Sequence, residues 1–205
     1  MSAHPSGAEP DETVHVWRAD LDCPGWPGAG GLPPAERERA ARLAHPVRRR
    51  RWVAARWALR GVLAGYLDRA PAEIELCAGE RGKPRLASPD RALRFNLSHS
   101  GVRALVAVAW DREVGVDVEE LGSRPGDFYA AWTRREAVAK CHGVGLWAPL
   151  PDAAVAVSQI EAPAGFAAAL AVSGEEMPTR THFLAEPFEG SVGAAELAVV
   201  PGGDA

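Results

Sequence analysis

Apolar and polar residues alternate along several short stretches of the chain, a period of two that predicts β-strands. In the first half of the chain the predicted strands cover residues 13–18, 73–77, 93–97 and 103–110. In the second half they cover residues 114–119, 153–158, 166–172, 181–185 and 193–200. Gly/Pro-rich segments at 23–34 and 79–90 predict loops.

Three stretches have helical spacing instead. The first runs from Pro34, a residue well suited to the first turn of a helix, to about residue 44. The second covers 46–68, and the third covers 127–141, where Gly143 predicts a C-terminal cap. Strands, a long helix and further strands thus occur twice in order.

This repeated order predicts an α+β fold made of two similar α/β halves related by a pseudo-twofold axis. The break between them falls near Asp111, so we expect an N-terminal half at 1–111 and a C-terminal half at 112–205. Two related halves in one chain favour a monomer.

The chain has 205 residues, a formal net charge of −4, and 47% apolar and 24% charged residues. Such a composition is ordinary for a folded protein and gives no general attraction to nucleic acid. The first twelve residues lack the apolar stretch of a signal peptide, and no run is long enough to span a membrane. We therefore expect a cytoplasmic protein. Its three widely spaced cysteines, Cys23, Cys77 and Cys141, predict free and buried thiols.

Positive charge is concentrated in one region, which suggests a small polyanion or an acidic partner. Nine arginines lie there: Arg37, Arg39, Arg42, Arg48, Arg49, Arg50, Arg51, Arg56 and Arg60. The run at 48–51 goes right round one helical turn, so part of this set must be solvated surface.

The segment 114–119 (VGVDVE) places two carboxylates on one face of a strand. Asp117 and Glu119 then project together while Val116 and Val118 enter the core. Two carboxylates 4 Å apart repel by about 1 kcal/mol in water and by about 4 kcal/mol at an effective dielectric of 20. Oxygen ligands without nearby His or Cys suit Mg²⁺. A solvated strand end is the alternative reading of this pair.

Glu136 and Lys140 lie four residues apart in the third helix and share a face. They add a third carboxylate and a cation, although a surface ion pair worth about 0.3–0.5 kcal/mol would have the same spacing.

Two further features suit an anion. Lys83 lies in a stiff Gly-Lys-Pro turn, and residues 96–101 (NLSHSG) place four polar groups at an expected strand-to-turn junction. Ser98 and His99 are adjacent, which does not indicate a hydrolase triad, and a lone histidine in a turn is more often structural.

Taken together, these segments resemble the phosphopantetheinyl transferase superfamily, specifically its pseudo-dimeric surfactin-synthetase-activating type. The matching segments are ERERAARL (36–43), RWVAARWALRGVL (51–63), GKP (82–84), FNLSHSG (95–101), GVDVE (115–119), WTRREAVAK (132–140) and GVGL (143–146). They occur in the family's order and cover nearly the whole chain.

The resemblance implies coenzyme A as co-substrate and Mg²⁺ as cofactor. The implied magnesium ligands are Asp117, Glu119 and Glu136. The implied contacts to coenzyme A are Lys140 at the pyrophosphate, Ser98 and His99 at the nucleotide phosphates, Arg39 and Arg56 at the 3′-phosphate, and Lys83 at the adenine pocket.

The implied reaction transfers phosphopantetheine to a serine of an apo acyl or peptidyl carrier protein. The serine hydroxyl attacks the β-phosphorus and 3′,5′-ADP leaves, with Asp117, Glu136 and Lys140 as the catalytic residues. Glu136 would accept the proton directly or through a metal-bound water.

The chain departs from the family pattern at two places. Arg134-Arg135 replaces a basic pair that often ends in Lys, and only twelve residues separate Glu119 from Trp132, where the family has a longer carrier-binding segment. Two alternatives therefore stay open: a non-catalytic relative that binds coenzyme A or a carrier protein, and a metal-dependent phosphohydrolase that uses water as acceptor.

Overall fold

A computed structural model describes residues 13–79, 83–87 and 93–184 of the chain. Its strands are β1 (Val14–Asp20), β2 (Leu76–Ala78), β3 (Pro84–Leu86), β4 (Leu93–Ser100), β5 (Arg103–Trp110), β6 (Val114–Glu120), β7 (Val155–Gln159), β8 (Phe166–Ser173) and β9 (Thr179–Phe183). Its helices are α1 (Pro34–Ala41), α2 (Pro46–Leu67) and α3 (Gly126–His142). Short 3₁₀ turns lie at Ala29–Gly31 and Pro71–Glu73.

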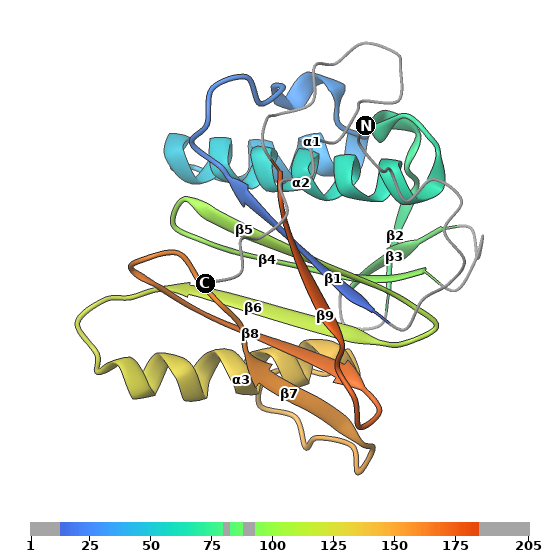
Figure 1. Cartoon of the computed structure of the whole chain (residues 1–205). Coiled ribbons are helices and arrows are strands. Elements are labelled where there is room, and N and C mark those ends of the chain that lie inside the picture. Colours follow the sequence, from blue (N-terminus) through green and yellow to red (C-terminus); the bar gives the residue numbers. More distant parts are fainter. Residues whose placement is uncertain (1–12, 80–82, 88–92, 185–205) are drawn as a thin grey trace, which may run out of the picture.

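The elements stack in four layers, helix, sheet, sheet and helix (Figure 1). Helices α1 and α2 cover the outer face of a four-stranded sheet of order β4-β5-β1-β9. A three-stranded sheet of order β6-β8-β7 packs on the inner face of the first, and α3 covers its outer side. The α+β class is confirmed, while the twofold relation between the halves stays a prediction.

Strand β9 lies parallel to β1, although the two are separated by most of the described chain. All the other paired strands run antiparallel. The buried ring of His182 on β9 stacks on Trp17 of β1, with centroids 4.4 Å apart. The first sheet therefore includes a strand from the second half of the sequence, and the two proposed halves are interleaved.

Three apolar layers hold the stack together. Leu59, Leu63 and Tyr66 of α2 pack with Trp17 and Phe95 on the outer face of the first sheet. The valines and small residues of the inner faces fill the space between the two sheets. A third cluster, rich in alanine, lies between α3 and the second sheet. Small side chains there let the helix approach the sheet closely.

The ends of α3 follow the sequence expectation. Pro125 precedes the first turn and Asp127 lies within it, where a carboxylate is favourable. Gly143 adopts φ +66°, the left-handed conformation that ends many helices, and its N–H donates to the Lys140 carbonyl. Lys140 and His142 lie in the last turn. The site helix is thus bounded by local signals.

The structure agrees with most predicted elements to within a few residues, and three expectations are wrong. Strand β3 (Pro84–Leu86) lies within the predicted loop at 79–90, because it pairs antiparallel with β2. Ser98, His99 and Ser100 belong to β4 and not to a turn, because the reversal is made by Gly101, whose φ is +53°. Of the three free thiols, only that of Cys141 is buried, while Cys77 is exposed. The strand predicted at 193–200 lies outside the described residues.

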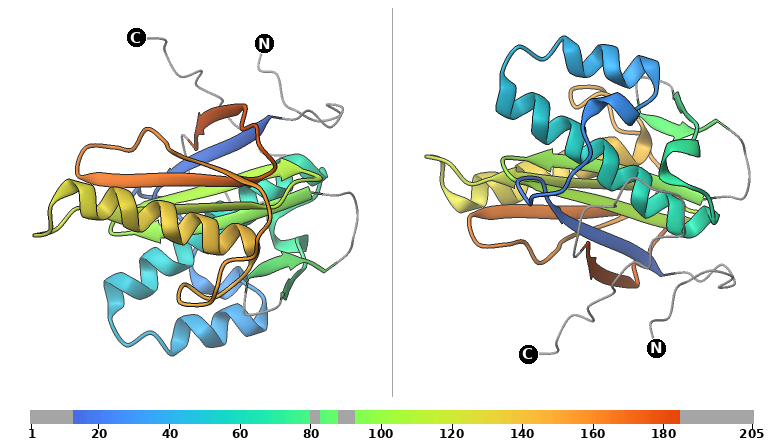
Figure 2. Two further views of the ribbon diagram at one scale, coloured as in Figure 1. Left: turned by 90° about the horizontal axis from the view of Figure 1, so that it is seen from below. Right: turned by 90° about the horizontal axis from the view of Figure 1, so that it is seen from above.

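Figure 2 gives two further views of the same stack, from below and from above. In both, α3 lies on one side of the sheets and α1 and α2 on the other. Within the described residues, none of the helices combines the length and the apolar character needed to cross a bilayer.

Candidate active site

The acidic pair of β6 lies on one face of that strand, as the alternation predicts. Val116 and Val118 are buried between the two sheets. Asp117 points to the opposite side, toward α3, and is only 1% exposed. Glu119 follows on the same face and is half-buried. The reading of this pair as a solvated strand end therefore does not hold for Asp117.

Helix α3 lies directly on β6 at Gly115. A β-carbon at this position would lie 2.0 Å from the carbonyl oxygen of Ala137 and 2.3 Å from the backbone nitrogen of Cys141. Only glycine permits such a close approach of two backbones. Both contacts flank Lys140 along the helix, so this approach brings the Lys140 side chain to Asp117.

Lys140 is the centre of the resulting cluster. Its ammonium group donates to Oδ1 of Asp117 at 2.5 Å and to Oγ of Ser98 at 2.9 Å. It also lies 3.4 Å from Oε2 of Glu136. Ser98 in turn donates from Oγ to the same Asp117 oxygen at 2.8 Å. Residues from β4, β6 and α3 therefore meet at one buried carboxylate.

The other oxygen of Asp117, Oδ2, is buried and has no hydrogen-bond partner among the described residues. An unpaired buried polar atom is costly, so native structures rarely keep one without a reason. Its position beside a second carboxylate makes a bound cation the natural partner.

The electrostatics also indicate a surplus of negative charge. Burial raises the pKa of Asp117, against the lowering effect of Lys140 and Ser98, and the charge of Glu119 raises it further. Burial, and then the negative charge of Asp117, raise the pKa of Glu136. One ammonium group does not neutralise three neighbouring carboxylates.

Strand β4 forms the second wall of the site through a period-two row of polar side chains. Oδ1 of Asn96 accepts from the N–H of Val116 at 2.9 Å. Oγ of Ser100 accepts from the N–H of Glu120 at 3.1 Å and donates to Oε2 of Glu119 at 2.9 Å. These side chains join β4 to β6 at the sheet edges, where the two strands share no backbone ladder.

Comparisons with known proteins point the same way as this geometry. The chain is 34% identical over 182 residues to the 4′-phosphopantetheinyl transferase HetI of Nostoc, covering 73% of this chain and 76% of that protein. It is 31% identical over 160 residues to a putative 4′-phosphopantetheinyl transferase of Synechocystis, covering 64% and 65%. It is 33% identical over 146 residues to the 4′-phosphopantetheinyl transferase AcpT of Escherichia coli, covering 58% and 69%.

This chain belongs to the 4′-phosphopantetheinyl transferase family. No family model matches it. Assignment to the surfactin-synthetase-activating type stays a prediction.

In this family member, the predicted nucleotide contacts are distributed over two sides of β4. Ser98 faces the carboxylates, and His99 lies on the opposite face of the strand, where part of its surface is accessible and the rest is covered. Partial burial, followed by the positive charges of Lys140 and Arg56, lowers the pKa of His99. His99 is therefore influenced by two positive charges, one from Lys140 on α3 and one from Arg56 on α2. The sequence predicts that both of these residues contact coenzyme A.

Arg56 and Arg39 have different surroundings. Arg56 is buried, and its guanidinium donates to Glu36 of α1 at 2.5 Å and 3.1 Å. Arg39 lies exposed in the last turn of α1 and makes no ion pair or side-chain hydrogen bond with the described residues. Of the two, Arg39 is the arginine available to an external anion.

Lys83 uses its ammonium group inside the protein. Its Nζ contacts Oε2 of Glu113 at 2.9 Å and the carbonyl oxygens of Val114 and Cys141 at 3.0 and 3.4 Å. The side chain is 9% exposed. Three acceptors satisfy its three N–H groups, and the predicted role of Lys83 at an adenine pocket stays a prediction. Gly82 lies outside the described residues.

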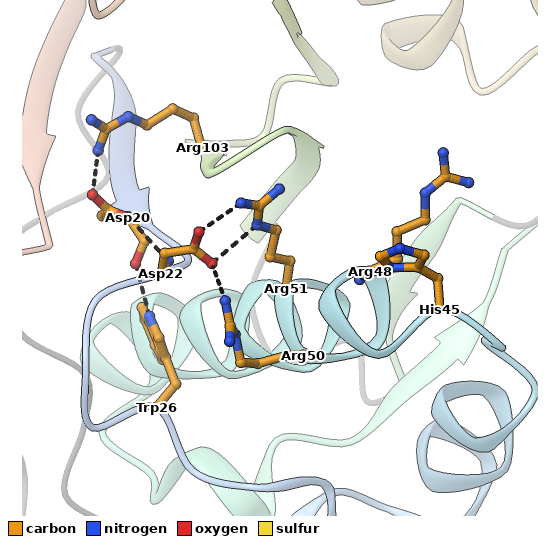
Figure 3. Close-up of polar contacts among 8 residues, drawn as sticks. All are labelled: Asp20, Asp22, Trp26, His45, Arg48, Arg50, Arg51 and Arg103. Carbon is orange, nitrogen blue, oxygen red and sulfur yellow. Dashed lines mark hydrogen bonds and ion pairs between the residues drawn. The ribbon is translucent and has the colours of Figure 1, made fainter.

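The arginine run at the start of α2 is partly paired (Figure 3). Arg51 donates to both oxygens of Asp22, at 3.0 and 2.6 Å, and Arg50 donates to one of them at 2.9 Å. Hydrogen bonds from these two arginines lower the pKa of Asp22. Arg48 points away from this carboxylate, next to the helix-capping His45 (Figure 3).

Sequence reasoning missed Gly115 and Ser100 as parts of the site. Gly115 carries no chemistry, and only the approach of α3 reveals its role. Ser100 could have been found, because Asn96, Ser98 and Ser100 alternate as polar residues on one strand face. Reading the segment as a turn hid that alternation.

Within the described part of the chain, no three His, Cys, Asp or Glu side chains are already gathered closely enough to hold a metal ion. The donor set nevertheless suits Mg²⁺, which prefers carboxylate oxygens and retains several waters. The unpaired oxygen of Asp117 and the raised pKa of Glu136 are compatible with carboxylates that could hold such an ion.

Proposed function

We propose that this protein transfers the 4′-phosphopantetheine arm of coenzyme A to a serine of an apo acyl or peptidyl carrier protein, giving the holo-carrier and 3′,5′-ADP. We further propose that it acts in the cytoplasm as a monomer. The observation that carries the proposal is the buried Asp117, bound through one oxygen to Lys140 and Ser98 and unpaired at the other, in a chain of this family.

Asp117, Glu119 and Glu136 are the residues that would hold Mg²⁺. When bound, the ion would supply positive charge and Lewis acidity to the diphosphate of coenzyme A. Glu119 now accepts a hydrogen bond from Ser100, and Glu136 lies beside Lys140, so both carboxylates have a polar neighbour that holds them near Asp117.

Lys140 is positioned to bind the diphosphate. Its ammonium group lies at the junction of β4, β6 and α3, where it already contacts two oxygen atoms closely. Its third neighbour, Oε2 of Glu136, is more distant at 3.4 Å, and a phosphate oxygen would take the place of that contact. His99 and Arg39 would bind the phosphates of the nucleotide, with the charge of Arg56 adding to the positive field.

Glu136 is the proposed proton acceptor. Its raised pKa makes Glu136 a stronger base than an exposed glutamate, and its carboxylate lies next to the ammonium group of Lys140. The serine oxygen forms a bond to the β-phosphorus, and the bond from that phosphorus to 3′,5′-ADP breaks. The serine proton passes to Glu136, directly or through a water. Positioning and charge neutralisation supply most of the rate enhancement in such transfers.

The test is direct. The protein is incubated with coenzyme A, Mg²⁺ and a panel of apo acyl and peptidyl carrier proteins, and each carrier is weighed by mass spectrometry. We expect at least one carrier to gain the mass of phosphopantetheine, with no gain in EDTA or on a carrier whose acceptor serine is replaced by alanine.

Two other results would overturn the proposal. Binding of coenzyme A without a mass gain on any carrier would indicate a non-catalytic relative. Release of 3′,5′-ADP in the absence of carrier would indicate a phosphohydrolase.

A further inference from the structure

Strand β6 lies at the edge of its sheet, and among the described residues only one of its two edges is paired with another strand. Ser173 donates its N–H to the carbonyl oxygen of Glu113 at 2.9 Å, just before β6 begins. Leu121 donates to the carbonyl oxygen of Gly165 at 2.8 Å, just after it ends. The odd-numbered residues therefore bond toward β8, and the backbone groups of the even-numbered residues point to the other edge, toward β4.

Two side chains of β4 bind backbone groups on this second edge. Oδ1 of Asn96 accepts from the N–H of Val116 at 2.9 Å, and both residues are buried. Oγ of Ser100 accepts from the N–H of Glu120 at 3.1 Å. A buried N–H without an acceptor is costly, so these side chains take the place of the carbonyl oxygens that a paired strand would supply.

A third side chain comes from the turn before β3. Nζ of Lys83 donates to the carbonyl oxygen of Val114 at 3.0 Å and to that of Cys141 at 3.4 Å. Cys141 lies in the last turn of α3, where carbonyl oxygens lack partners within the helix and a cation is favourable. Lys83 therefore joins the start of β6 to the end of α3. We name Lys83, Asn96 and Ser100 the edge-binding residues.

The joint between β4 and β6 differs from an ordinary pair of strands in what can lie along it. Paired strands are about 4.8 Å apart, and backbone hydrogen bonds fill the space between them. Here the strands are joined through side chains, so the polar side chains of β4 can reach the carboxylates of β6. Ser98, between Asn96 and Ser100 in the alternation of β4, does so by donating to Oδ1 of Asp117 at 2.8 Å.

Ser100 contacts two successive residues of β6 with one hydroxyl group. Besides accepting from the N–H of Glu120, it donates to Oε2 of Glu119 at 2.9 Å. A hydroxyl has one donor and two acceptor positions, so both bonds can form together. The next residue, Gly101, has φ +53°, and a β-carbon there would clash with the carboxylate of Glu120. The end of β6 is thus packed against the reversal that follows β4.

We propose that the edge-binding residues are positioning residues, which hold β6 in place for magnesium binding, and that Ser100 sets the orientation of the Glu119 carboxylate. The inference rests on the proposed function, in which Glu119 is a magnesium ligand. It gives Asn96 and Ser100 a role that requires no contact with substrate. For Lys83, this role is separate from any contact that its turn makes with the nucleotide.

The variants separate the hydroxyl group of Ser100 from its surroundings. Ser100→Ala removes the hydroxyl, while Ser100→Thr keeps it and suits a strand. Asn96→Ala removes the acceptor of the Val116 N–H. The matched control is Ser158→Ala, because Ser158 is an exposed serine of β7 whose hydroxyl donates to the carbonyl oxygen of the adjacent Gln159.

The first measurement is amide hydrogen exchange by NMR, without coenzyme A or Mg²⁺. We expect Ser100→Ala to speed exchange of the Glu120 N–H about fivefold or more and to leave that of Val116 within about twofold of wild type. Asn96→Ala should do the reverse. Ser100→Thr and Ser158→Ala should match wild type at both positions.

The second measurement is a Mg²⁺ titration of the same proteins, followed through the amide signals of β6. Loss of a partner that orients a metal ligand typically weakens metal binding at least tenfold, so we expect Ser100→Ala to raise Kd for Mg²⁺ about tenfold. Ser100→Thr and Ser158→Ala should stay within about twofold of wild type. In turnover, the half-saturating Mg²⁺ concentration should rise by the same factor in Ser100→Ala, with KM for coenzyme A at saturating Mg²⁺ unchanged within about twofold.

The remaining outcomes separate this inference from the proposed function. Unchanged exchange of the Glu120 N–H in Ser100→Ala would overturn the edge contact. Faster exchange with an unchanged Kd for Mg²⁺, or a Ser100→Thr variant as weak as Ser100→Ala, would overturn the positioning role. A Kd for Mg²⁺ that depends on Ser100, in a protein that modifies no carrier, would support the positioning role and overturn the transferase reaction.

Discussion

Among the described residues, a cluster between α1 and α2 and a cluster between β4, β6 and α3 both pair buried arginine or lysine with carboxylates, and they differ in how completely their charges are satisfied. In the first, between α1 and α2, Glu36 is bound by Arg56 and Arg60. In the second, between β4, β6 and α3, Lys140 is bound by Asp117 and lies beside Glu136. Both have the short distances of strong ion pairs.

The first cluster is closed. Both oxygens of Glu36 accept hydrogen bonds, and Arg60 also donates to the carbonyl oxygens of Ile74 and Pro71 at 2.6 and 3.2 Å. Burial works against ionisation of Glu36, but the hydrogen bonds from Arg60 and Arg56 outweigh it and lower its pKa. Two cations on one carboxylate, with carbonyl acceptors for the remaining N–H groups, leave little for an external ligand.

The second cluster is open. Carboxylates outnumber cations, one Asp117 oxygen has no partner among the described residues, and the pKa values of Asp117 and Glu136 are raised. Buried ion pairs are therefore not evidence of function in themselves. The two clusters differ in geometry, since Glu36 is paired at both oxygens and Asp117 at one, and the opposite directions of their carboxylate pKa shifts agree with that difference.

The largest expected effect comes from removing the negative charge of Asp117, because carboxylates outnumber cations in the open cluster. Asp117→Asn keeps the shape of the side chain but removes its charge, so we expect transfer activity to fall at least about 1000-fold. Far-ultraviolet circular dichroism should be unchanged. Activity within about tenfold of wild type would show that Asp117 neither binds the metal nor positions Lys140.

The next effect breaks the closed cluster. Glu36→Gln leaves two buried guanidinium groups without their counter-charge, so we expect the free energy of unfolding to fall by about 3–5 kcal/mol in urea denaturation. The matched control is Glu38→Gln, because Glu38 pairs with Arg42 at 3.4 Å on the exposed side of the same helix. That change should cost at most about 0.5 kcal/mol. Equal effects of the two substitutions would contradict the distinction drawn here.

The smallest effect concerns the stability of the open cluster and its dependence on pH. A carboxylate whose pKa is raised by folding destabilises the native state above that pKa, and the penalty disappears as pH falls toward its ordinary value of 3.8. In EDTA at pH 7 we therefore expect Asp117→Asn to be more stable than wild type, as measured by urea denaturation. The difference should shrink as pH falls toward 4.

Adding Mg²⁺ should make the wild type more stable than Asp117→Asn. The wild type should gain thermal stability with Mg²⁺ because the native state alone binds the ion, while Asp117→Asn should gain little. A wild-type protein that is already the more stable of the two in EDTA would show that the Asp117 charge is satisfied without a metal.

Much of this fold could be predicted because its local signals agree with one another. Strand β6 alternates over 114–119, and burial follows that alternation, with Val116 and Val118 in the core and the carboxylates on the other face. Helix α3 has a glycine cap and a Glu–Lys pair at helical spacing. These are properties of neighbouring residues, so the sequence shows them directly.

The parts that could not be predicted depend on contacts between distant segments. The pairing of Arg56 with Glu36 joins residues twenty positions apart on two different helices, and nothing in the run of arginines distinguishes Arg56 from the exposed Arg39. The hydrogen bond from Lys83 to the carbonyl oxygen of Cys141, near the end of α3, also joins residues far apart in sequence. The sequence predicts a turn at Ser98 and His99, but the pairing of β4 with β5 extends the strand through both residues.

The parallel pairing of β9 with β1 has a consequence for how this protein is made. Strand β1 emerges from the ribosome early, but its second neighbour, residues 179–183, is synthesised only after more than 150 further residues. Until then one edge of β1 has open backbone groups, which is the kind of edge that invites pairing with other chains. Such long-range closure is slow, so the nascent chain should need protection until its last described strand has been added.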